Sequence, residues 1–290
     1  MRVLVVGASG HLGSAVTEYM KASADVTATT RADLDVREHR AVEATVKRVS
    51  PDVVINCSAY TDVDRAEDEP AEAFEVNAFA VKRLAAAARA AGAAFVHYST
   101  DFVFDGTADR PYAEEDEPNP RSTYACSKLI GEWFAREAGR HYVLRVESVF
   151  GSLAPSSSPR RTSVDRILDA ILEGREARVF VDRTVSPSYS ADVARATWDL
   201  LERRAPGGLY HCVSSGSCTW EALAREAARQ LNVEPRLDPV RMADARLRAD
   251  RPRYCALANG RLAGAGVVMP SWQDALARYL RDRVAPTARP

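Results

Sequence analysis

Tyr124 and Lys128 stand four residues apart in STYACSKLIGEWF (122–134), a segment with the pattern of an amphipathic helix. Residues at i and i+4 share one helical face, about 6 Å apart along the axis. A phenol and an ammonium at this spacing can serve proton transfer, because positive charge favours the phenolate and lowers a tyrosine pKa from about 10. The alternative interpretation is a packed tyrosine beside a solvated lysine.

A third candidate group stands at the end of the apolar segment AAFVHYST (93–100). In a doubly wound sheet, ligands bind at the carboxyl ends of the strands, so Thr100 is expected beside the same site. A hydroxyl, a phenol and an ammonium suit hydride transfer to a carbonyl carbon, whose oxygen gains negative charge and takes a proton. We therefore predict that Tyr124 donates the proton and that Thr100, rather than Ser99, hydrogen-bonds the carbonyl. Lys128 is expected to lower the pKa of the phenol and to hold a ribose hydroxyl.

The motif GASGHLG (7–13) supplies the site for the hydride carrier. It follows the first predicted strand directly and opens a helix, the context in which glycines let a pyrophosphate approach backbone amides at a helix N-terminus. The predicted contacts from this motif are Gly7, Ser9, Gly10, His11, Leu12 and Gly13.

The end of the second predicted strand favours NADP(H) over NAD(H). It reads Thr29-Thr30-Arg31, and an acidic residue appears only at Asp33. A carboxylate at the strand tip would hold a ribose 2′-hydroxyl, whereas Arg31 would pair with a 2′-phosphate. NAD(H) stays open. The remaining predicted cofactor contacts are Asp35 and Val36 around the adenine, Cys57, Ser58, Ala59 and Tyr60 after the third strand, and Tyr124 and Lys128.

Short apolar runs alternate with helix-period segments through the first half of the chain, as expected for a parallel sheet covered on both faces. The predicted strands are residues 2–8, 25–30, 52–59, 93–100 and 142–146. The sequence therefore predicts an α/β fold, a Rossmann-type doubly wound parallel sheet with a smaller C-terminal substrate-binding lobe. We expect residues 1–150 to form the NAD(P)-binding domain, elements near 185–215 to return to it, and residues 151–184 and 216–290 to form the lobe. The serine- and proline-rich stretch 151–163 is expected to be a mobile loop.

Composition excludes several other functions. The 290 residues carry a formal charge of −1, which gives no reason to expect nucleic acid or an anionic membrane as a partner. No apolar run approaches the length of a bilayer span. Five scattered cysteines and five dispersed histidines predict neither a disulfide framework nor a metal site, and a cytoplasmic setting is expected. The four tryptophans are expected to fill the core.

The motifs GASGHLG, YSTDFVFDG and YACSKLIGE together resemble the extended short-chain dehydrogenase/reductase superfamily. More narrowly, NCSAYTDVDRAEDEPAEAFEVNA (56–78), HYSTDFVFDGT (97–107) and RPRYCALANGRL (251–262) are similar to the dTDP-4-dehydrorhamnose reductase family. The likeness is strong over the first 150 residues and patchy from 151 to 200. It implies that Thr100, Tyr124 and Lys128 are catalytic and that NAD(P)H reduces the 4-keto group of a nucleotide-linked deoxysugar.

The resemblance also implies where the sugar binds. The expected substrate-binding residues are Ser99, Thr100, Asp101, Phe102, Val103, Glu147, Ser148 and Arg251. Glu147 and Ser148 stand where the family usually has a small residue and tryptophan, which leaves the identity of the sugar open. For the diphosphate of the substrate, Arg160, Arg161, Arg183 and Arg251 are candidates, with Arg251 preferred because its segment is family-like.

Two other functions are compatible with these motifs. A sugar-nucleotide epimerase or dehydratase uses the same three catalytic groups with tightly bound NAD, and the β subunit of methionine adenosyltransferase resembles this family without being catalytic. The motifs do not determine the product stereochemistry or the oligomeric state, for which a homodimer is one option.

Overall fold

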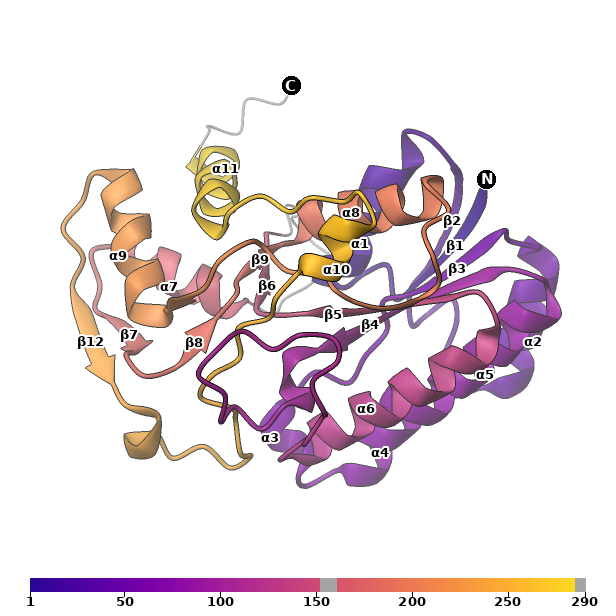
Figure 1. Cartoon of the computed structure of the whole chain (residues 1–290), viewed down its shortest axis with the longest axis horizontal. Helices are drawn as coiled ribbons and strands as arrows, with labels where there is room; N and C mark the ends of the chain where they lie inside the picture. The colour runs from indigo at the N-terminus through magenta and orange to yellow at the C-terminus, as the bar shows by residue number, and fades with distance from the viewer. Residues whose placement is uncertain (152–160, 285–290) are drawn as a thin grey trace.

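The computed structural model describes residues 1–151 and 161–284. The predicted loop at 151–163 lies largely outside these residues, as does Arg160. The chain forms a central sheet with helices on both faces. A second group of helices and short strands lies beside it, at the left of the view in Figure 1. This α/β arrangement is the predicted fold class.

The central sheet has six strands in the order β10-β5-β4-β3-β1-β2, and every pairing is parallel. Five of the strands correspond to the five predicted apolar runs. The sixth comes from the second half of the chain and pairs with β5. The bounds are β1 (Arg2–Val6), β2 (Asp25–Thr29), β3 (Val53–Asn56), β4 (Ala94–Thr100), β5 (His141–Val146) and β10 (Gly208–His211).

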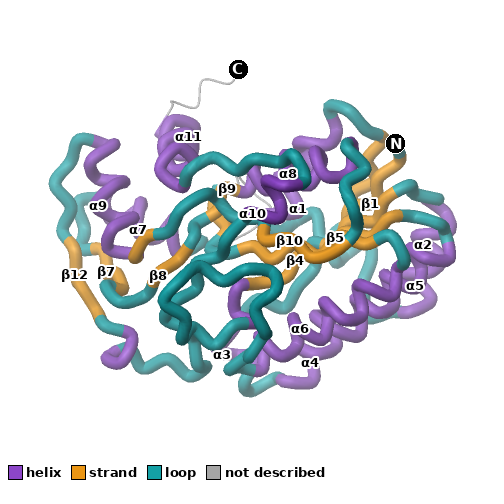
Figure 2. Tube along the Cα trace, in the orientation of Figure 1, coloured by secondary structure: helices purple, strands orange, loops and turns teal. Residues whose placement is uncertain are grey.

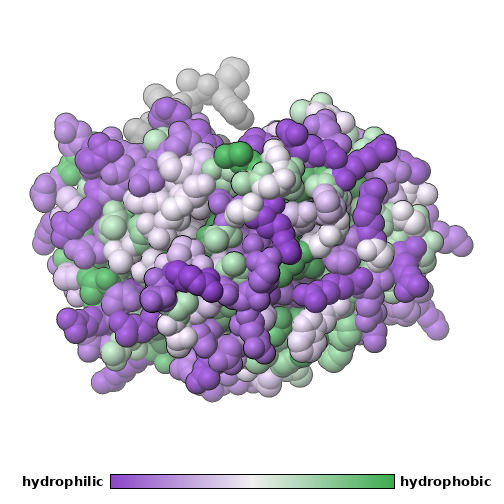
Figure 3. Space-filling model, in the orientation of Figure 1, coloured by the Kyte–Doolittle hydropathy of each residue, from purple (hydrophilic) through white to green (hydrophobic). Residues whose placement is uncertain are grey.

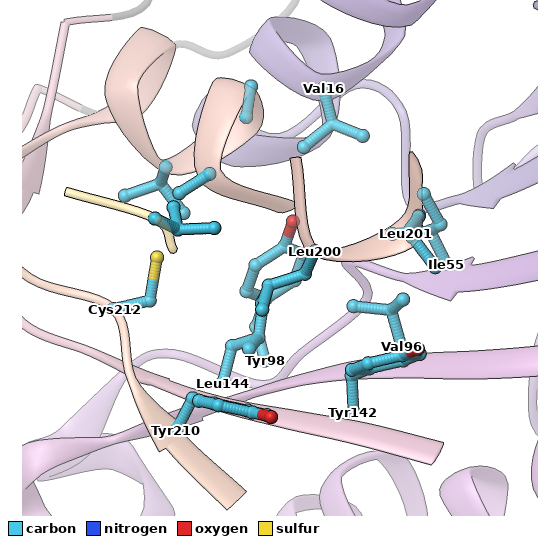
Figure 4. Packing of buried hydrophobic residues seen from close by; sticks show 14 of the residues in the cluster. Val16, Ile55, Val96, Tyr98, Tyr142, Leu144, Leu200, Leu201, Tyr210 and Cys212 are labelled. Carbon is cyan, nitrogen blue, oxygen red and sulfur yellow. The ribbon is translucent and has the colours of Figure 1, made fainter. Parts of the chain in front are cut away.

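Successive side chains of the central strands enter two different hydrophobic clusters, because a strand presents alternate residues to opposite faces. In β1, Val3 and Val5 pack in the cluster that contains Leu200, whereas Leu4 and Val6 pack in the cluster on the other face. Figure 4 shows the first cluster from close by. Burial on both faces explains why these strands are continuous apolar runs.

The covering helices lie in two layers, one on each side of the strands (Figure 2). One layer holds α1 (His11–Lys21), α8 (Ser190–Glu202) and α10 (Gly260–Gly264). The other layer holds α2 (His39–Val49), α4 (Pro70–Phe74), α5 (Ala80–Ala90) and α6 (Thr123–Ala135), with the short α3 (Val63–Ala66) near them. A π-helical turn, Glu75–Phe79, joins α4 to α5, and 3₁₀ turns Asp101–Val103 and Arg136–Ala138 follow β4 and α6.

The second group of elements encloses its own hydrophobic cluster, to which Leu168, Leu223 and Leu276 contribute. Three pairs of short strands, β6–β9, β7–β12 and β8–β11, connect its helices. Its elements are β6 (Val149–Phe150), α7 (Ser163–Leu172), β7 (Ala177–Phe180), β8 (Thr184–Val185), β9 (Ser188–Tyr189), β11 (Cys218–Thr219), α9 (Trp220–Leu231), β12 (Leu237–Val240), the 3₁₀ turn Met242–Asp244 and α11 (Trp272–Val284). The division into a cofactor domain and a substrate lobe at the predicted bounds remains our proposal.

The expectation that all four tryptophans fill the core is wrong for Trp133, which is 56% exposed. Helix α6 instead approaches the Asn77 backbone through Gly131. A Cβ atom at Gly131 would lie 2.2 Å from the Asn77 carbonyl oxygen, so only glycine permits this approach. Because the face of α6 that carries Gly131 packs against the protein, Trp133 points to solvent.

The face of the molecule drawn in Figure 3 is mostly hydrophilic, with small scattered hydrophobic groups. Within the described ranges, every helix falls short of the combined length and apolarity that a bilayer span needs.

His211 at the end of β10 is fully buried and neutral. Its Nδ1 lies 3.1 Å from the Ala258 carbonyl oxygen and its Nε2 lies 3.4 Å from Nη1 of Arg145. The carbonyl can only accept and the guanidinium can only donate, so Nδ1 carries the hydrogen. Burial, and then the charge of Arg145, lowers the pKa of His211 from 6.5 to about 3.

This histidine makes the fold sensitive to acid. Between about pH 6.5 and 3 the unfolded chain binds a proton at this position that the folded chain does not, so the free energy of unfolding falls as pH falls. We expect His211→Gln to reduce this decline, measured by urea denaturation between pH 7 and 5, by up to about 1.4 kcal/mol per pH unit. An equal slope in the unaltered protein and in His211→Gln would contradict the account.

Candidate active site

A cavity of about 660 Å³ opens at the carboxyl ends of β1, β2 and β3. Gly7, Ser9 and Gly10 line it, and Gly10 precedes α1 with no side-chain cap on the first amides. Gly7 has φ +81°, and a Cβ there would lie 2.6 Å from the Ser58 amide nitrogen. Gly13 contacts the Gly7 carbonyl so closely that a Cβ would lie 2.2 Å from it. Uncapped amides and glycine contacts of this kind fit a pyrophosphate.

The other residues predicted around the cofactor are distributed as follows. His11 begins α1 and Leu12 packs against the hydrophobic cluster of Figure 4, so neither lines the cavity. The walls of the cavity include Arg31, Asp35, Val36, Cys57, Ser58, Ala59 and Tyr60.

The charged residues near the end of β2 include the predicted Arg31 and Asp33, and a further arginine, Arg37. Thr30 donates to Asp33 from its amide and its hydroxyl, at 2.9 and 2.7 Å, so the Asp33 carboxylate closes the turn. Arg37 also lines the cavity, and its hydrogen bonds to Asp35 lower the pKa of that carboxyl to about 2. The Arg31 side chain is 74% exposed and lies 3.9 Å from Asp35, so its guanidinium is available for an anion.

Arg31 can therefore be tested by substitution. We expect Arg31→Ala to weaken NADPH binding about 10- to 100-fold while NADH binding changes little, because a hydrogen bond to a charged group contributes about 1.5–3 kcal/mol. Fluorescence titration of both nucleotides measures this ratio. Arg48→Ala, at an exposed position on α2, is the control. An equal loss for both nucleotides would mean that Arg31 does not contact a 2′-phosphate.

Thr100 and Tyr124 meet at the end of β4. The Thr100 hydroxyl donates to Asp101 Oδ1 at 3.0 Å and lies near enough to the Tyr124 phenol to lower its pKa. The Phe102 ring meets the Tyr124 ring edge-on, with centroids 5.7 Å apart. Burial raises the pKa of Tyr124 to about 12, and the nearby Thr100 hydroxyl opposes this rise. The phenol is therefore protonated at neutral pH and has a hydrogen that it can donate.

Lys128 was expected to lower the pKa of the Tyr124 phenol, and this expectation is wrong for the net pKa. Its Nζ donates to the Tyr98 carbonyl oxygen at 2.6 Å, and burial lowers its pKa to about 8. The pKa of Tyr124 is raised rather than lowered, because burial outweighs every other influence on the phenol. The ammonium nevertheless lies near the cavity, since it acts electrostatically on the cavity-lining Cys57.

Asn77 is a residue that sequence reasoning missed. It lies in the π-helical turn Glu75–Phe79, accepts from the Tyr60 amide at 2.9 Å and donates to Ser127 Oγ at 3.0 Å. Ser127 in turn donates to the Tyr124 carbonyl oxygen at 2.7 Å. This chain connects the wall of the cavity to the first turn of α6. A π turn commonly marks a functional position, but its extra residue leaves no clear sequence pattern.

Ser99, the second choice for the carbonyl contact, faces another buried group. Its hydroxyl donates to Glu132 Oε1 at 2.6 Å, and Glu132 forms a fully buried ion pair with Arg145. Thr100, by contrast, lies with the phenol, so the geometry favours Thr100 for that contact.

The residues expected around the sugar are brought together in part. Asp101 and Glu147 lie close together, both buried, and Phe102 stands between Tyr124 and the guanidinium of Arg183. Val103 is fully buried in a separate cluster, and Ser148 adopts φ +43°.

Those arginines proposed for the diphosphate that the structure describes are engaged within the protein. Arg251 forms a bidentate ion pair with Asp64, with N–O distances of 2.8 and 2.9 Å. Arg161 lies 3.4 Å from Asp169. Arg183 is buried against Phe102 and Cys255, so it lies among the groups beside Tyr124 rather than on an open anion-binding surface.

Comparison with known proteins adds the following. Residues 1–284 match the family described as RmlD substrate binding domain. The chain is 37% identical to a dTDP-4-dehydrorhamnose reductase of Streptomyces griseus, over 95% of this chain and 91% of that protein. It is 35% identical to a probable dTDP-4,6-dihydroxy-2-methyloxan-3-one 4-ketoreductase of Streptomyces antibioticus, over 98% and 96% of the two chains.

Among solved structures, the dTDP-4-dehydrorhamnose reductase of Bacillus anthracis in complex with NADP superposes with a TM-score of 0.90. The two chains are 30% identical, and the match covers 97% of this chain and 99% of that one.

Proposed function

Because the chain belongs to the dTDP-4-dehydrorhamnose reductase family of the extended short-chain dehydrogenases/reductases, we propose that it reduces the 4-keto group of a dTDP-linked 6-deoxysugar with NADPH. The chain is thus an NAD(P)-dependent oxidoreductase of the short-chain type. The observation that carries the specific proposal is a protonated Tyr124 that lies beside Thr100 and is joined through Ser127 and Asn77 to Tyr60 on the wall of the cofactor-sized cavity.

The proposed roles follow from the geometry. NADPH supplies the hydride when it is bound. Gly7, Gly10 and the first amides of α1 would hold its pyrophosphate, and Arg31 would pair with the 2′-phosphate. The NADP complex of the Bacillus anthracis relative supports this choice of nucleotide.

Tyr124 would donate its proton to the carbonyl oxygen as negative charge develops there, and Thr100 would orient that oxygen. Lys128 is held by the Tyr98 carbonyl and would stabilise the phenolate that remains. The buried setting keeps the phenol protonated until the substrate oxygen becomes a stronger base.

A spectrophotometric assay of NADPH oxidation tests the proposal. The purified protein should consume NADPH with at least one member of a panel of dTDP- and UDP-linked 4-keto-6-deoxysugars. Nucleotide extracted from the protein separates the alternatives, because an epimerase or dehydratase would carry stoichiometric NAD. Co-purification with a protein partner and no turnover of any 4-keto sugar would favour the regulatory-subunit alternative.

A further inference from the structure

Two carboxyl groups meet at the carboxyl edge of the central sheet because of the strand register. Thr100 at the end of β4 pairs with Val146 at the end of β5, and Asp101 and Glu147 are the next residues along the chain. Parallel neighbours release the residues that follow them at the same edge, where ligands bind in a doubly wound sheet. The register therefore places both carboxyl groups where a substrate is expected.

These carboxyl groups belong to a buried polar cluster with unused hydrogen-bonding capacity. One side-chain oxygen or sulfur atom from each of Asp101, Glu147 and Cys255 lies within 4.8 Å of the other two. Arg183 completes the cluster, with Nη2 3.7 Å from Cys255 Sγ. Among the residues described, Asp101 Oδ2, Glu147 Oε1 and Arg183 Nε have no hydrogen-bond partner, although each of the four residues is at most 8% exposed. Unpartnered buried polar atoms are costly, so the cluster calls for an occupant.

The spacing of the cluster fits one small polar atom. A point among three atoms that lie 4.8 Å apart is about 2.8 Å from each of them, which is a hydrogen-bond distance. A hydroxyl placed there donates its hydrogen to one carboxylate, and its oxygen accepts from Arg183 or from the other carboxyl in its protonated form. An ammonium donates to both carboxylates and brings the positive charge that one guanidinium lacks for two of them.

A metal ion does not suit the cluster. The Cys255 thiol donates its hydrogen to the Pro252 carbonyl oxygen at 3.2 Å and accepts from Arg183, so the sulfur is not the thiolate that a metal binds. The guanidinium of Arg183 already brings positive charge to the cluster, and it would repel a metal cation.

The cluster lies beside the proposed proton donor. The Phe102 ring meets the Tyr124 ring edge-on at 5.7 Å and also lies 5.1 Å from the Arg183 guanidinium. When Tyr124 hydrogen-bonds a ketone oxygen at C4 of a sugar, the substituents on C3 and C5 lie next to that oxygen. In a 6-deoxysugar C5 carries an apolar methyl group, whereas C3 carries the polar substituent. The cluster therefore matches the C3 side of the ketone.

Resting on the proposed reductase function, we propose that Asp101, Glu147 and Arg183 form a subsite for a hydrogen-donating substituent at C3 of the keto sugar, a hydroxyl or an amino group. The substituent supplies the hydrogens that the carboxylate oxygens lack and replaces any water bound at the same point. The subsite selects 4-keto sugars that keep this donor. It rejects 3-deoxy sugars, because their C–H bonds leave the buried oxygens unpartnered.

Three dTDP-linked 4-keto-6-deoxysugars test this selection: the parent with hydroxyls at C2 and C3, its 2-deoxy analogue and its 3-deoxy analogue. The measurement is kcat/KM from NADPH oxidation. The 2-deoxy control should stay within about tenfold of the parent. The 3-deoxy sugar should fall at least about 10²-fold, since a site built to bind a hydroxyl rejects analogues that lack it by about 10⁴- to 10⁵-fold. Equal values for the parent and the 3-deoxy sugar would overturn the proposal.

Substitution of Glu147 assigns the selection to the cluster. Glu147→Ala should lower the ratio of kcat/KM for the parent over the 3-deoxy sugar at least about tenfold, because an oxygen that the 3-deoxy sugar leaves unpartnered is removed. Glu114→Gln is the control and should keep the ratio, since Glu114 is also buried and accepts one backbone amide, from His211 at 2.9 Å. An unchanged ratio in Glu147→Ala contradicts the subsite.

Glu147→Gln is a milder variant and separates the two kinds of donor. Its amide oxygen can still accept from the Ser186 amide, as Glu147 Oε2 does at 2.6 Å, and its NH₂ group then faces the subsite. A C3 hydroxyl can accept from that NH₂ group, whereas an ammonium cannot. The kcat/KM for a 3-amino sugar should therefore fall at least about tenfold more than that for the 3-hydroxy sugar. Equal kcat/KM values to those of the unaltered protein for both sugars would contradict the subsite.

Binding of the reduced sugars gives a readout that needs no turnover. Calorimetric titration of the NADP⁺ complex would compare a dTDP-linked 6-deoxyhexose with its 3-deoxy analogue. The 3-deoxy analogue should bind at least about tenfold more weakly, and Glu147→Ala should narrow the difference. If the unaltered protein reduces no 4-keto sugar, the reductase proposal fails by itself. Equal affinity for the two alcohols, or binding of neither, overturns the subsite in either case.

Discussion

Tyr124→Phe is expected to lower kcat by about 10²- to 10⁴-fold while NADPH binding stays within about twofold, because the phenyl ring keeps the packing and loses only the proton donor. Steady-state NADPH oxidation with the best substrate of the panel gives kcat. Fluorescence titration gives the affinity for NADPH. The edge-on contact with Phe102 does not need the hydroxyl, so the fold should be preserved.

Tyr112→Phe is the matched control for this substitution. Tyr112 is a buried tyrosine whose hydroxyl donates to Asp105 at 3.0 Å, and it belongs to a separate hydrophobic cluster. Removal of the Tyr112 hydroxyl should lower the free energy of unfolding and should change kcat little. Full activity of Tyr124→Phe would show that another group donates the proton.

Glu132→Ala is expected to lower the free energy of unfolding by about 3–5 kcal/mol, because it leaves the Arg145 guanidinium buried without its anion. Both side chains are at most 1% exposed, and the carboxylate accepts from Arg145 Nε at 2.8 Å and Nη2 at 2.9 Å. The carboxylate also accepts from Ser99, directly before Thr100. Urea denaturation at pH 7 measures the change.

An exposed ion pair provides the comparison. Glu221 contacts Arg225 one turn along α9, and the arginine side chain is 61% exposed. Glu221→Ala should cost no more than about 1 kcal/mol. Equal losses for Glu132→Ala and Glu221→Ala would mean that burial of the Arg145 pair does not determine its contribution.

The parts of the fold that depend on local pattern could be predicted from the sequence. The five apolar runs became neighbouring parallel strands because burial on both faces requires continuous hydrophobic sequence. The glycine motif was readable because the turn at Gly7 and the contact at Gly13 exclude any side chain. The spacing of Tyr124 and Lys128 was informative because one helix fixes it.

Features that depend on contacts between distant segments could not be predicted in the same way. Arg183 and Cys255 reach Glu147 only through the packing of the second group of elements, and Asp64 reaches Arg251 across 187 positions. The exposure of Trp133 depends on which face of α6 its neighbours occupy. The raised pKa of Tyr124 depends on burial, which spacing alone does not encode.

Deuterium transfer tests the central claim most directly. The protein would be incubated with the accepted 4-keto sugar nucleotide and NADPH deuterated at both C4 positions of the nicotinamide, and the product analysed by NMR. The account predicts one deuterium at C4 of the sugar alcohol. A product whose C4 carries only hydrogen, or recovery of the unreduced ketone with every nucleotide sugar in the panel, would contradict it.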